Sequence, residues 1–486
     1  MMNWGFYGRQ VEAEDLTSIL SGNRWFFVKV TGRRRIGKTT LIQQALQGSG
    51  REQVFYFQTP DSAAAGVLSA VHDALDTFGI SEDVAPRPHT LRELAKTIGC
   101  LVRRGFAVAI DEFQYFHRKA LAEFSSHLQG EVDRLVAPGE KVTGGLIVLG
   151  SIHTEVTSLL EDRDAPLYNR ATNALHLSHL DLGAIRAMLI EHEAMDPHRL
   201  LFLWNLFEGV PKFYRDCFES GVLAGGRQEL LDRTMFTSSA PLRNEAENWF
   251  LRELRGRYDV ILKFLARHPG CHHADILAHV KQVSHETKEQ VGGYLKILEE
   301  RYGMIERLPP VFQAKSARKN RYYIADNFLR TWLAALASPI SALAFRAKSE
   351  LLSEADHRLA IAEGHGLNRM IGQLYEERSR RGLPGFSLSQ RVHGYWDRGD
   401  TELDLVAIDE TRRIVRVANI KRAPEKLMSS ESVFLGHVER FLDAFPHLRA
   451  WQVERAMVTV TLSHDARKDL ETRGYVAQDL MDLLPT

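Results

Sequence analysis

The sequence predicts an α/β fold whose first part is a parallel β-sheet with helices on both faces. Three observations support this fold class. Short, continuous apolar runs alternate with helical patterns through the first 175 residues. A glycine-rich loop that ends in Lys-Thr lies between one of these runs and a helix. The chain has 486 residues, which at about 150 residues per domain leaves room for roughly three or four domains.

The expected strands of the first part are short and apolar on both faces, as is typical of parallel sheets buried between helical layers. They span Phe26–Thr31, Val54–Gln58, Phe106–Ile110 and Leu146–Leu149. Helices are expected at Thr39–Leu46, Ala63–Phe78 and Leu91–Arg104. The pattern then becomes mostly helical, next gives short helices with an aromatic, basic stretch, and finally alternates helix and strand. We place domain boundaries near residues 175, 240 and 345.

The composition excludes several classes of protein. Hydrophobic residues make up 44% and charged residues 26% of the chain, which excludes wholesale disorder. The 62 basic and 62 acidic residues cancel, so any polyanion must bind at a local patch. Three cysteines cannot build a disulfide framework and indicate a reducing cytoplasm. The longest apolar stretch contains Arg330 and Pro339, so we expect a buried helix and no membrane partner.

The strongest motif fits the pattern G-x-x-x-x-G-K-[ST], and a strand precedes it while a helix follows. Its residues are Gly32, Arg33, Arg34, Arg35, Ile36, Gly37, Lys38 and Thr39, with Thr40 opening the helix. The glycines let backbone N–H groups turn towards phosphate oxygens, and the helix adds its positive end. Lys38 is expected to reach the β- and γ-phosphates, and Thr39 to offer its hydroxyl to Mg²⁺. The alternative is a chance match in a loop.

Two further strand ends supply polar groups for the same site. Asp111 and Glu112 follow an apolar strand, so Asp111 is expected to hold the Mg²⁺ water shell and Glu112 to polarise the attacking water. Ser151 follows another strand and is expected beside the γ-phosphate as a polar sensor. The alternatives are two solvated acids for the first pair and a helix N-cap for the serine.

Phosphoryl transfer also needs a cation for the charge that develops in the transition state. Arg170 is the candidate, supplied within one chain or by a neighbouring subunit, and the alternative is a structural ion pair. The side chains of the run Arg33-Arg34-Arg35 could contact the nucleotide or a partner. The alternative is that they are exposed to solvent.

Several motifs resemble those of one family. They are Phe6-Tyr7-Gly8-Arg9 with Glu12 and Leu16, Pro166-Leu167-Tyr168-Asn169-Arg170 with Asn169 in place of the usual glycine, Gly209-Val210-Pro211-Lys212, and the stretch from Arg321 to Trp332. Through them nearly the whole chain resembles the archaeal-type P-loop ATPases, which are related to the STAND and AAA+ ATPases. The resemblance implies an ATPase core over residues 1–175, a helical lid over 176–240, a winged helix over 241–345 and a restriction-endonuclease-like domain over 346–486. It also implies ATP and Mg²⁺ as cofactors and a homo-oligomer.

The segment from 257 to 335 agrees with a winged helix when it is considered alone. Helices are expected at Tyr258–His268, His273–Val280 and Ser284–Leu298, followed by strands at Met304–Arg307 and Arg321–Ile324. The basic residues of the loop between these strands are Lys315, Arg318, Lys319 and Arg321. We expect them to hold DNA phosphates, and the alternative is a module that only packs between domains. Cys271-His272-His273 lacks a second ligand pair at zinc spacing and is interpreted as a helix entry.

Restriction-endonuclease-like nucleases hold Mg²⁺ with an Asp and an acid from the next strand, and a Lys two residues further on orients the water. Asp404 and Lys421 match this pattern, but Asn419 replaces the second acid. Asn368 likewise stands where relatives often carry Glu. Amides are weak Mg²⁺ ligands, so the sequence favours a degenerate, non-cleaving domain. A working nuclease, with Glu363, Glu402 or Asp400 as substitute ligand, is the alternative.

Three hypotheses for the function follow. The first is an ATP-hydrolysing, DNA-associated protein that couples its nucleotide state to DNA binding through the winged helix and the nuclease-like domain. The second is a STAND-type switch in which ATP controls oligomerisation. The third is a DNA-binding scaffold with nucleotide as a structural ligand, and Glu112 favours the first two over it.

Overall fold

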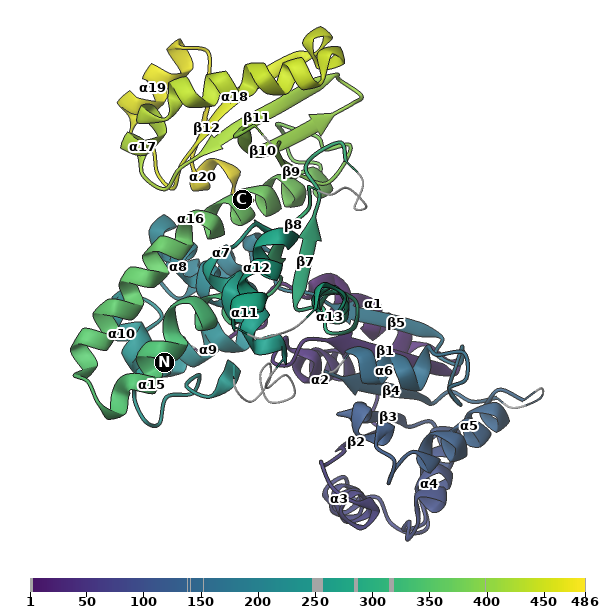
Figure 1. The fold of residues 1–486 in the computed structure, drawn as a ribbon. Helices are drawn as coiled ribbons and strands as arrows, with labels where there is room; N and C mark the ends of the chain where they lie inside the picture. Colours follow the sequence, from purple (N-terminus) through teal and green to yellow (C-terminus); the bar gives the residue numbers. More distant parts are fainter. Residues whose placement is uncertain are drawn as a thin grey trace. The chain divides into compact units, whose positions relative to one another are not determined.

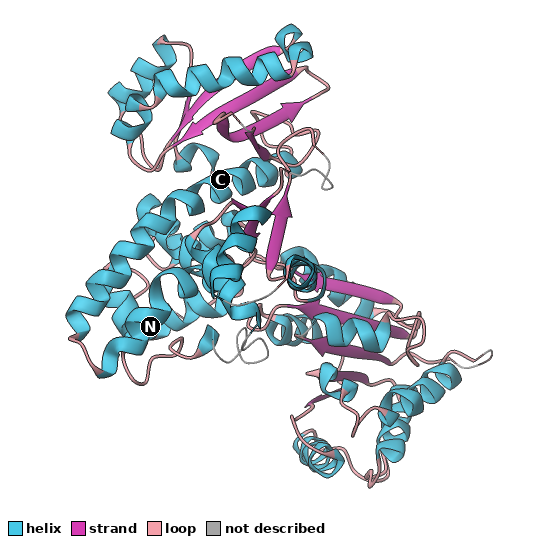
Figure 2. Cartoon of the chain, in the orientation of Figure 1, coloured by secondary structure: helices cyan, strands magenta, loops and turns pink. Residues whose placement is uncertain are grey.

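The computed structural model describes residues 3–137, 139, 141–151, 153–246, 257–283, 287–313, 319–397 and 399–485 (Figures 1 and 2). Its contacts divide the chain into two compact units. One is Arg9–His179, and the other joins Met1–Gly8 to Leu180–Thr486. The predicted boundary near 175 falls inside the last strand of the first unit. Among the described helices, none is both long and apolar enough to cross a membrane.

The described part of the first unit contains a parallel sheet with the strand order β2-β3-β4-β1-β5. Its strands are β1 (Phe26–Gly32), β2 (Val54–Gln58), β3 (Ala107–Asp111), β4 (Gly145–Gly150) and β5 (Asn173–Leu177). The predicted strands agree with β1 to β4 to within one residue at each end. β5 was not predicted, because this edge strand alternates between covered and exposed positions rather than forming a continuous apolar run.

The helices of this unit pack their apolar side chains against the sheet. They are α1 (Gln10–Ser21), α2 (Lys38–Ser49), α3 (Ala64–Thr77), α4 (Leu91–Arg103), the 3₁₀ helix η1 (Phe113–His117), α5 (Glu123–Leu135) and α6 (His153–Leu160). Thr90 caps the start of α4, because its hydroxyl accepts a hydrogen bond from the N–H of Glu93. Its apolar face, including Ile98 and Leu101, packs in one buried cluster with Val108 and Ile110 of β3. These contacts fix the end of β3, where the acidic residues lie.

The second unit begins with a helical segment, as predicted. It contains α7 (Leu182–Glu191), α8 (Pro197–Phe207), α9 (Pro211–Glu219), α10 (Arg227–Leu231) and the π-helical turn η2 (Asp232–Phe236). The side chains of Asp181 and Asp196 cap α7 and α8. Trp4, near the start of the chain, stacks on His192 with ring centroids 5.1 Å apart.

A small antiparallel sheet with the order β6-β8-β7 follows, in the segment where a winged helix is predicted. The elements are α11 (Arg257–Arg267), β6 (Cys271–His272), α12 (His273–Val283), α13 (Lys288–Lys296), the π-helical turn η4 (Ile297–Arg301), β7 (Ile305–Leu308) and β8 (Arg321–Ile324). The described part of the third helix starts after Thr287, which forms a capping box with Gln290, and the predicted start at Ser284 lies outside the described residues.

The apolar stretch around Arg330 forms short helices, and a long helix follows them. These are α14 (Asn327–Thr331), the π-helical turn η5 (Trp332–Leu336), α15 (Ala337–Ser341), the 3₁₀ turn η6 (Ala342–Ala344) and α16 (Lys348–Arg380). The charged run near Lys348–His357 is the first part of α16. It is helical because Leu351, Leu352 and Ala355 recur on one buried face while the charges take the other.

The last described part of the chain is a mixed sheet with the order β13-β12-β11-β10-β9. Its strands are β9 (His393–Trp396), β10 (Glu402–Asp409), β11 (Ile414–Ile420), β12 (Gln452–Val458) and β13 (Val476–Gln478). β9, β10 and β11 pair antiparallel, while β11, β12 and β13 pair parallel. The accompanying helices are α17 (Pro424–Ser429), α18 (Glu431–Ala444), η7 (Pro446–Ala450), α19 (His464–Thr472) and α20 (Leu480–Leu483).

Candidate functional site

The phosphate-loop motif connects β1 directly to α2. Gly32 and Gly37 have φ values of 149° and 96°, and Arg35 has a φ of 65°. A Cβ atom at Gly32 would lie 2.6 Å from the carbonyl oxygen of Leu177, so only glycine fits there. Ile36 is buried beneath the loop, whereas Arg34 and Thr40 are exposed. The loop therefore has the backbone conformation that a phosphate cradle needs, ahead of a 12-residue helix.

Lys38 is held inside this loop. Its Nζ donates hydrogen bonds to the carbonyl oxygens of Gly32, at 2.9 Å, and Arg33, at 3.1 Å. Burial lowers the pKa of Lys38 to about 8, although the nearby carboxylates of Glu112 and Asp111 act in the opposite direction. An anion beside Nζ would offset that desolvation, so the position suits a phosphate.

The predicted metal residues meet at the end of β3. Thr39 Oγ1 donates to Asp111 Oδ2 at 2.8 Å, and the N–H of Glu112 donates to Asp111 Oδ1 at 2.8 Å. Tyr56 of β2 also donates its hydroxyl to Asp111 Oδ2, at 3.0 Å. Burial and the charge of Asp111 raise the pKa of Tyr56, so this phenol stays a donor. No sequence pattern selects Tyr56, because its contact with Asp111 depends on β2 lying beside β3.

The carboxylate of Glu112 lies beside Ser151. Ser151 follows β4, which separates β1 from β3 in the sheet. Its Oγ donates to Glu112 Oε2 at 2.9 Å. The amide of Gln114 also donates to Glu112 Oε2, and no sequence pattern had singled out this glutamine. Glu112 has a φ of 52°, which is unusual for a residue with a side chain.

Arg170 is engaged elsewhere in this conformation. Its Nε and Nη2 donate to the two carboxylate oxygens of Asp133, at 2.7 and 3.0 Å, and its Nη1 donates to the carbonyl of Pro166 at 2.8 Å. The hydrogen bonds to Asp133 raise the pKa of Arg170. Asn169 has a φ of 56°, a left-handed conformation in which glycine is favoured and asparagine is tolerated. The geometry is that of the structural ion pair, and the role in phosphoryl transfer stays a prediction.

The described ends of the predicted DNA-binding loop pack against the C-terminal sheet. Arg321 pairs with Glu402 at 2.7 Å and lies 4.5 Å from the ring of Trp396. Trp396 Nε1 donates to the carbonyl of Lys319 at 2.7 Å. Val311 belongs to the buried cluster of the C-terminal sheet. Lys315 and Arg318 lie outside the described residues. Arg321 and its neighbours thus have the contacts expected of a packing module.

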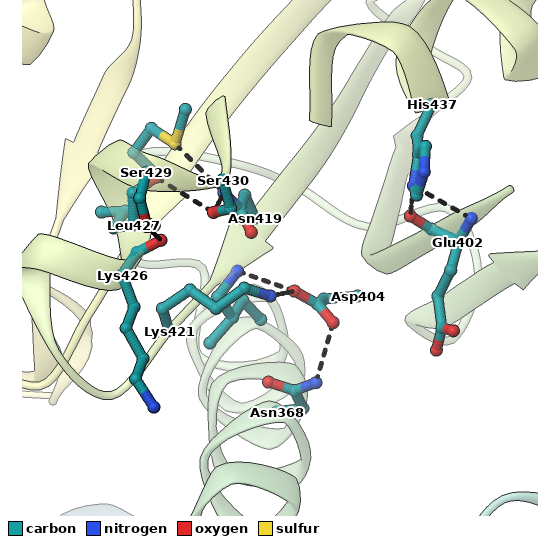
Figure 3. A network of polar contacts seen from close by, with 12 residues as sticks. Asn368, Glu402, Asp404, Asn419, Lys421, Lys426, Leu427, Ser429, Ser430 and His437 are labelled. Carbon is teal, nitrogen blue, oxygen red and sulfur yellow. Dashed lines mark hydrogen bonds and ion pairs between the residues drawn. The ribbon is translucent and has the colours of Figure 1, made fainter. Parts of the chain in front are cut away.

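Asp404 lies at the centre of a polar network at the C-terminal sheet (Figure 3). Its Oδ2 accepts from Lys421 Nζ at 3.0 Å and from the N–H of Ile420 at 2.9 Å. Its Oδ1 accepts from Asn368 Nδ2 of α16 at 3.1 Å. The residues that matched the nuclease pattern, Asp404 and Lys421, are therefore in contact, and Asn368 completes the group.

Three other predicted oxygen ligands of this region, Asn419, Glu363 and Glu402, already have protein partners. The amide of Asn419 donates to Ser430 Oγ at 2.8 Å. Glu363 is buried and pairs with both Arg227 and Arg422. Glu402 is bound by Arg321, whose hydrogen bond and charge outweigh burial and lower the pKa of the carboxyl group. Each substitute acid with a described ion pair is thus neutralised by arginine, and the amide oxygens that remain are poor replacements for carboxylates.

The matches to known proteins extend over most of the chain. No family model matches the chain. An uncharacterised protein of Methanocaldococcus jannaschii is 23% identical over 427 residues, which cover 86% of this chain and 87% of that protein. The Walker-type ATPase paby2304 of Pyrococcus abyssi has a TM-score of 0.50 and 17% identity, covering 68% of this chain and 96% of that one. The ORC2 protein of Aeropyrum pernix has a TM-score of 0.46 and 16% identity, covering 73% and 94%. The parallel sheet with its phosphate loop and the match to the Pyrococcus structure show that this chain has the P-loop NTPase fold.

Proposed function

We propose that this protein binds ATP with Mg²⁺ and hydrolyses it. The observation that carries the proposal is the meeting of Lys38, Thr39, Asp111 and Glu112 beside the phosphate loop. Adenine is the favoured base because the chain resembles P-loop ATPases and because its Pyrococcus neighbour is described as a Walker-type ATPase.

The residues of this site fit the two cofactors. The hydroxyl of Thr39 and the carboxylate of Asp111 are oxygen ligands of the kind that Mg²⁺ prefers, and they lie 2.8 Å apart. When bound, Mg²⁺ neutralises charge on the β- and γ-phosphate oxygens. Backbone N–H groups of the loop would hold the phosphates, and Lys38 would supply a positive charge from a buried position.

Glu112 is the residue that would act on water. Its carboxylate can accept a proton or a hydrogen bond from the water that attacks the γ-phosphate, which orients that water for reaction. Ser151 donates a hydrogen bond to this carboxylate. The proposed phosphate sensor, Ser151, is therefore linked directly to the proposed water-orienting residue, Glu112. Arg170 would have to leave Asp133 to take part.

The test is ATP turnover by the full chain, measured as phosphate release. Turnover is expected with ATP and Mg²⁺, and it should vanish when EDTA removes the metal. GTP in parallel tests the choice of base. If calorimetry detects neither ATP nor GTP binding to the folded protein, the proposal is refuted.

We further propose DNA as the partner, bound through the loop between β7 and β8. The support is chemical: Lys315, Arg318 and Lys319 are cations suited to phosphates, in a module whose element order agrees with a winged helix. A second candidate is the STAND-type switch, which the packing of Arg321 on Glu402 and Trp396 favours. Turnover stimulated by DNA supports the first, and ATP-dependent assembly without DNA supports the second.

Neutralising Lys315, Arg318 and Lys319 to alanine is expected to weaken binding to duplex DNA. The slope of log affinity against log salt should become shallower by about 0.9 for each phosphate contact that is lost. Fluorescence anisotropy over a range of salt concentrations measures both effects. The matched control replaces the exposed Arg92, Lys96 and Lys119, which removes the same charge from the first unit. Equal slopes for the two triple variants would remove this loop from DNA binding.

A further inference from the structure

Gln114 is a buried polar residue next to the proposed catalytic glutamate. It lies in η1, two residues after Glu112, and only 2% of its surface is exposed. Burying a primary amide without partners is unfavourable, so such a side chain normally has a defined set of hydrogen bonds. Its partners are groups of the proposed nucleotide site.

The amide of Gln114 connects the ends of β3 and β4. Its Nε2 donates to the carboxylate of Glu112 and lies 3.3 Å from the hydroxyl oxygen of Ser151. Its Oε1 accepts from the N–H of Ser151 at 3.3 Å. The approach is close enough that a Cβ atom at Gly150 would lie 3.1 Å from Oε1. Because Nε2 donates while Oε1 accepts, an amide satisfies both sides of this connection at once.

Glu112 needs such support. Its backbone is in the left-handed region, with a φ of 52°, which costs free energy and persists only where surrounding contacts hold it. Its N–H is bound to Asp111, and its carboxylate is bound to Ser151 and Gln114. The direction of the carboxylate is therefore set by Ser151, which follows β4, and by Gln114 of η1, which contacts both Glu112 and Ser151.

We propose that Gln114 is a positioning residue for ATP hydrolysis, one that holds the Glu112 carboxylate against Ser151 at the place where the attacking water must lie. The inference rests on the proposed function. Its action is on Glu112 and not on the nucleotide, because its described contacts are to Glu112 and Ser151. Loss of the amide should therefore slow the chemical step without weakening the binding of ATP.

Gln114→Met is the sharpest variant, because methionine has a similar length and removes the three hydrogen bonds of the amide without opening a large cavity. We expect kcat to fall about 10- to 100-fold, as is usual when a supporting partner of a reacting group is removed. The KM and the calorimetric affinity for ATP should stay as in the wild type. Gln114→Glu should lose more, because it replaces the donor with a like charge beside Glu112. Gln43→Met, at an exposed position of α2, is the matched control.

The outcomes separate the inference from the function on which it rests. A wild-type protein that binds ATP and hydrolyses it, together with an equally active Gln114→Met variant, overturns the inference alone. A parallel loss of ATP affinity and kcat also overturns it, since that result indicates a structural role. A wild-type protein without turnover overturns both. If Gln114→Met does not fold, Gln114→Asn keeps both amide groups one methylene short, and the same split between kcat and KM is required of it.

Discussion

Replacing Lys38 by alanine is expected to abolish the binding of ATP. Removing one member of a desolvated charge pair costs about 2–5 kcal/mol of binding free energy, which corresponds to a dissociation constant that is roughly 30- to 4,000-fold larger. The loss of affinity for Lys38→Ala should lie at the upper end of this range. Lys38 is buried in the loop, and its ammonium group is the one whose pKa burial has already lowered to about 8.

The measurement is isothermal titration of the folded variant with ATP and Mg²⁺. Lys38 also bonds the carbonyls of Gly32 and Arg33, so its loss can relax the loop. Thermal unfolding with and without nucleotide therefore accompanies the titration. Lys96→Ala, at an exposed position of α4, removes the same side chain away from the site and should bind ATP normally. Tight binding of ATP by the folded Lys38→Ala variant is incompatible with the assigned phosphate loop.

The residues that the sequence identified at the nucleotide site are those whose place follows from local pattern. A glycine loop between a strand and a helix fixes Lys38 and Thr39, and an apolar strand that ends in two acids fixes Asp111. Tyr56 contacts Asp111 and Gln114 contacts Ser151, and both contacts follow from strand order. That order depends on which strands pair in space, and no spacing along the chain encodes it directly.

Ion pairs between distant segments could not be predicted either, because they also depend on which segments lie together in space. Arg170 has the right character for a catalytic cation, and the helix α5 that carries its partner Asp133 was not among the expected elements. At the C-terminal sheet, Asp404 and Lys421 were selected by their match to the nuclease pattern, and the two side chains form an ion pair. The ion pair between Glu363 and Arg227 joins residues far apart in the chain, so no local pattern could predict it.

Glu112→Gln is expected to bind ATP and to hydrolyse it extremely slowly. The carboxamide has nearly the shape of the carboxylate, and its oxygen can still accept from Ser151 and Gln114, so the architecture of the site should be kept. A neutral amide cannot take up the proton of water or orient it with a negative charge. General-base assistance is commonly worth about 10²–10⁴-fold in rate, so kcat should fall by that factor.

The decisive measurement is the identity of the nucleotide that stays on the protein. After incubation with ATP and Mg²⁺, gel filtration and chromatography of the released nucleotide should yield ATP from Glu112→Gln and ADP from the wild type. Glu123→Gln, an exposed position at the start of α5, should behave as the wild type does. Ordinary turnover by Glu112→Gln would take Glu112 out of the reaction and would remove the reason to seek a positioning role for Gln114. Glu112→Gln should hold ATP without consuming it, whereas Lys38→Ala should hold none. Any assembly or DNA binding that Glu112→Gln shows and Lys38→Ala lacks must therefore come from bound ATP and not from its hydrolysis. This comparison separates a switch that responds to ATP binding from a protein that needs ATP turnover to act.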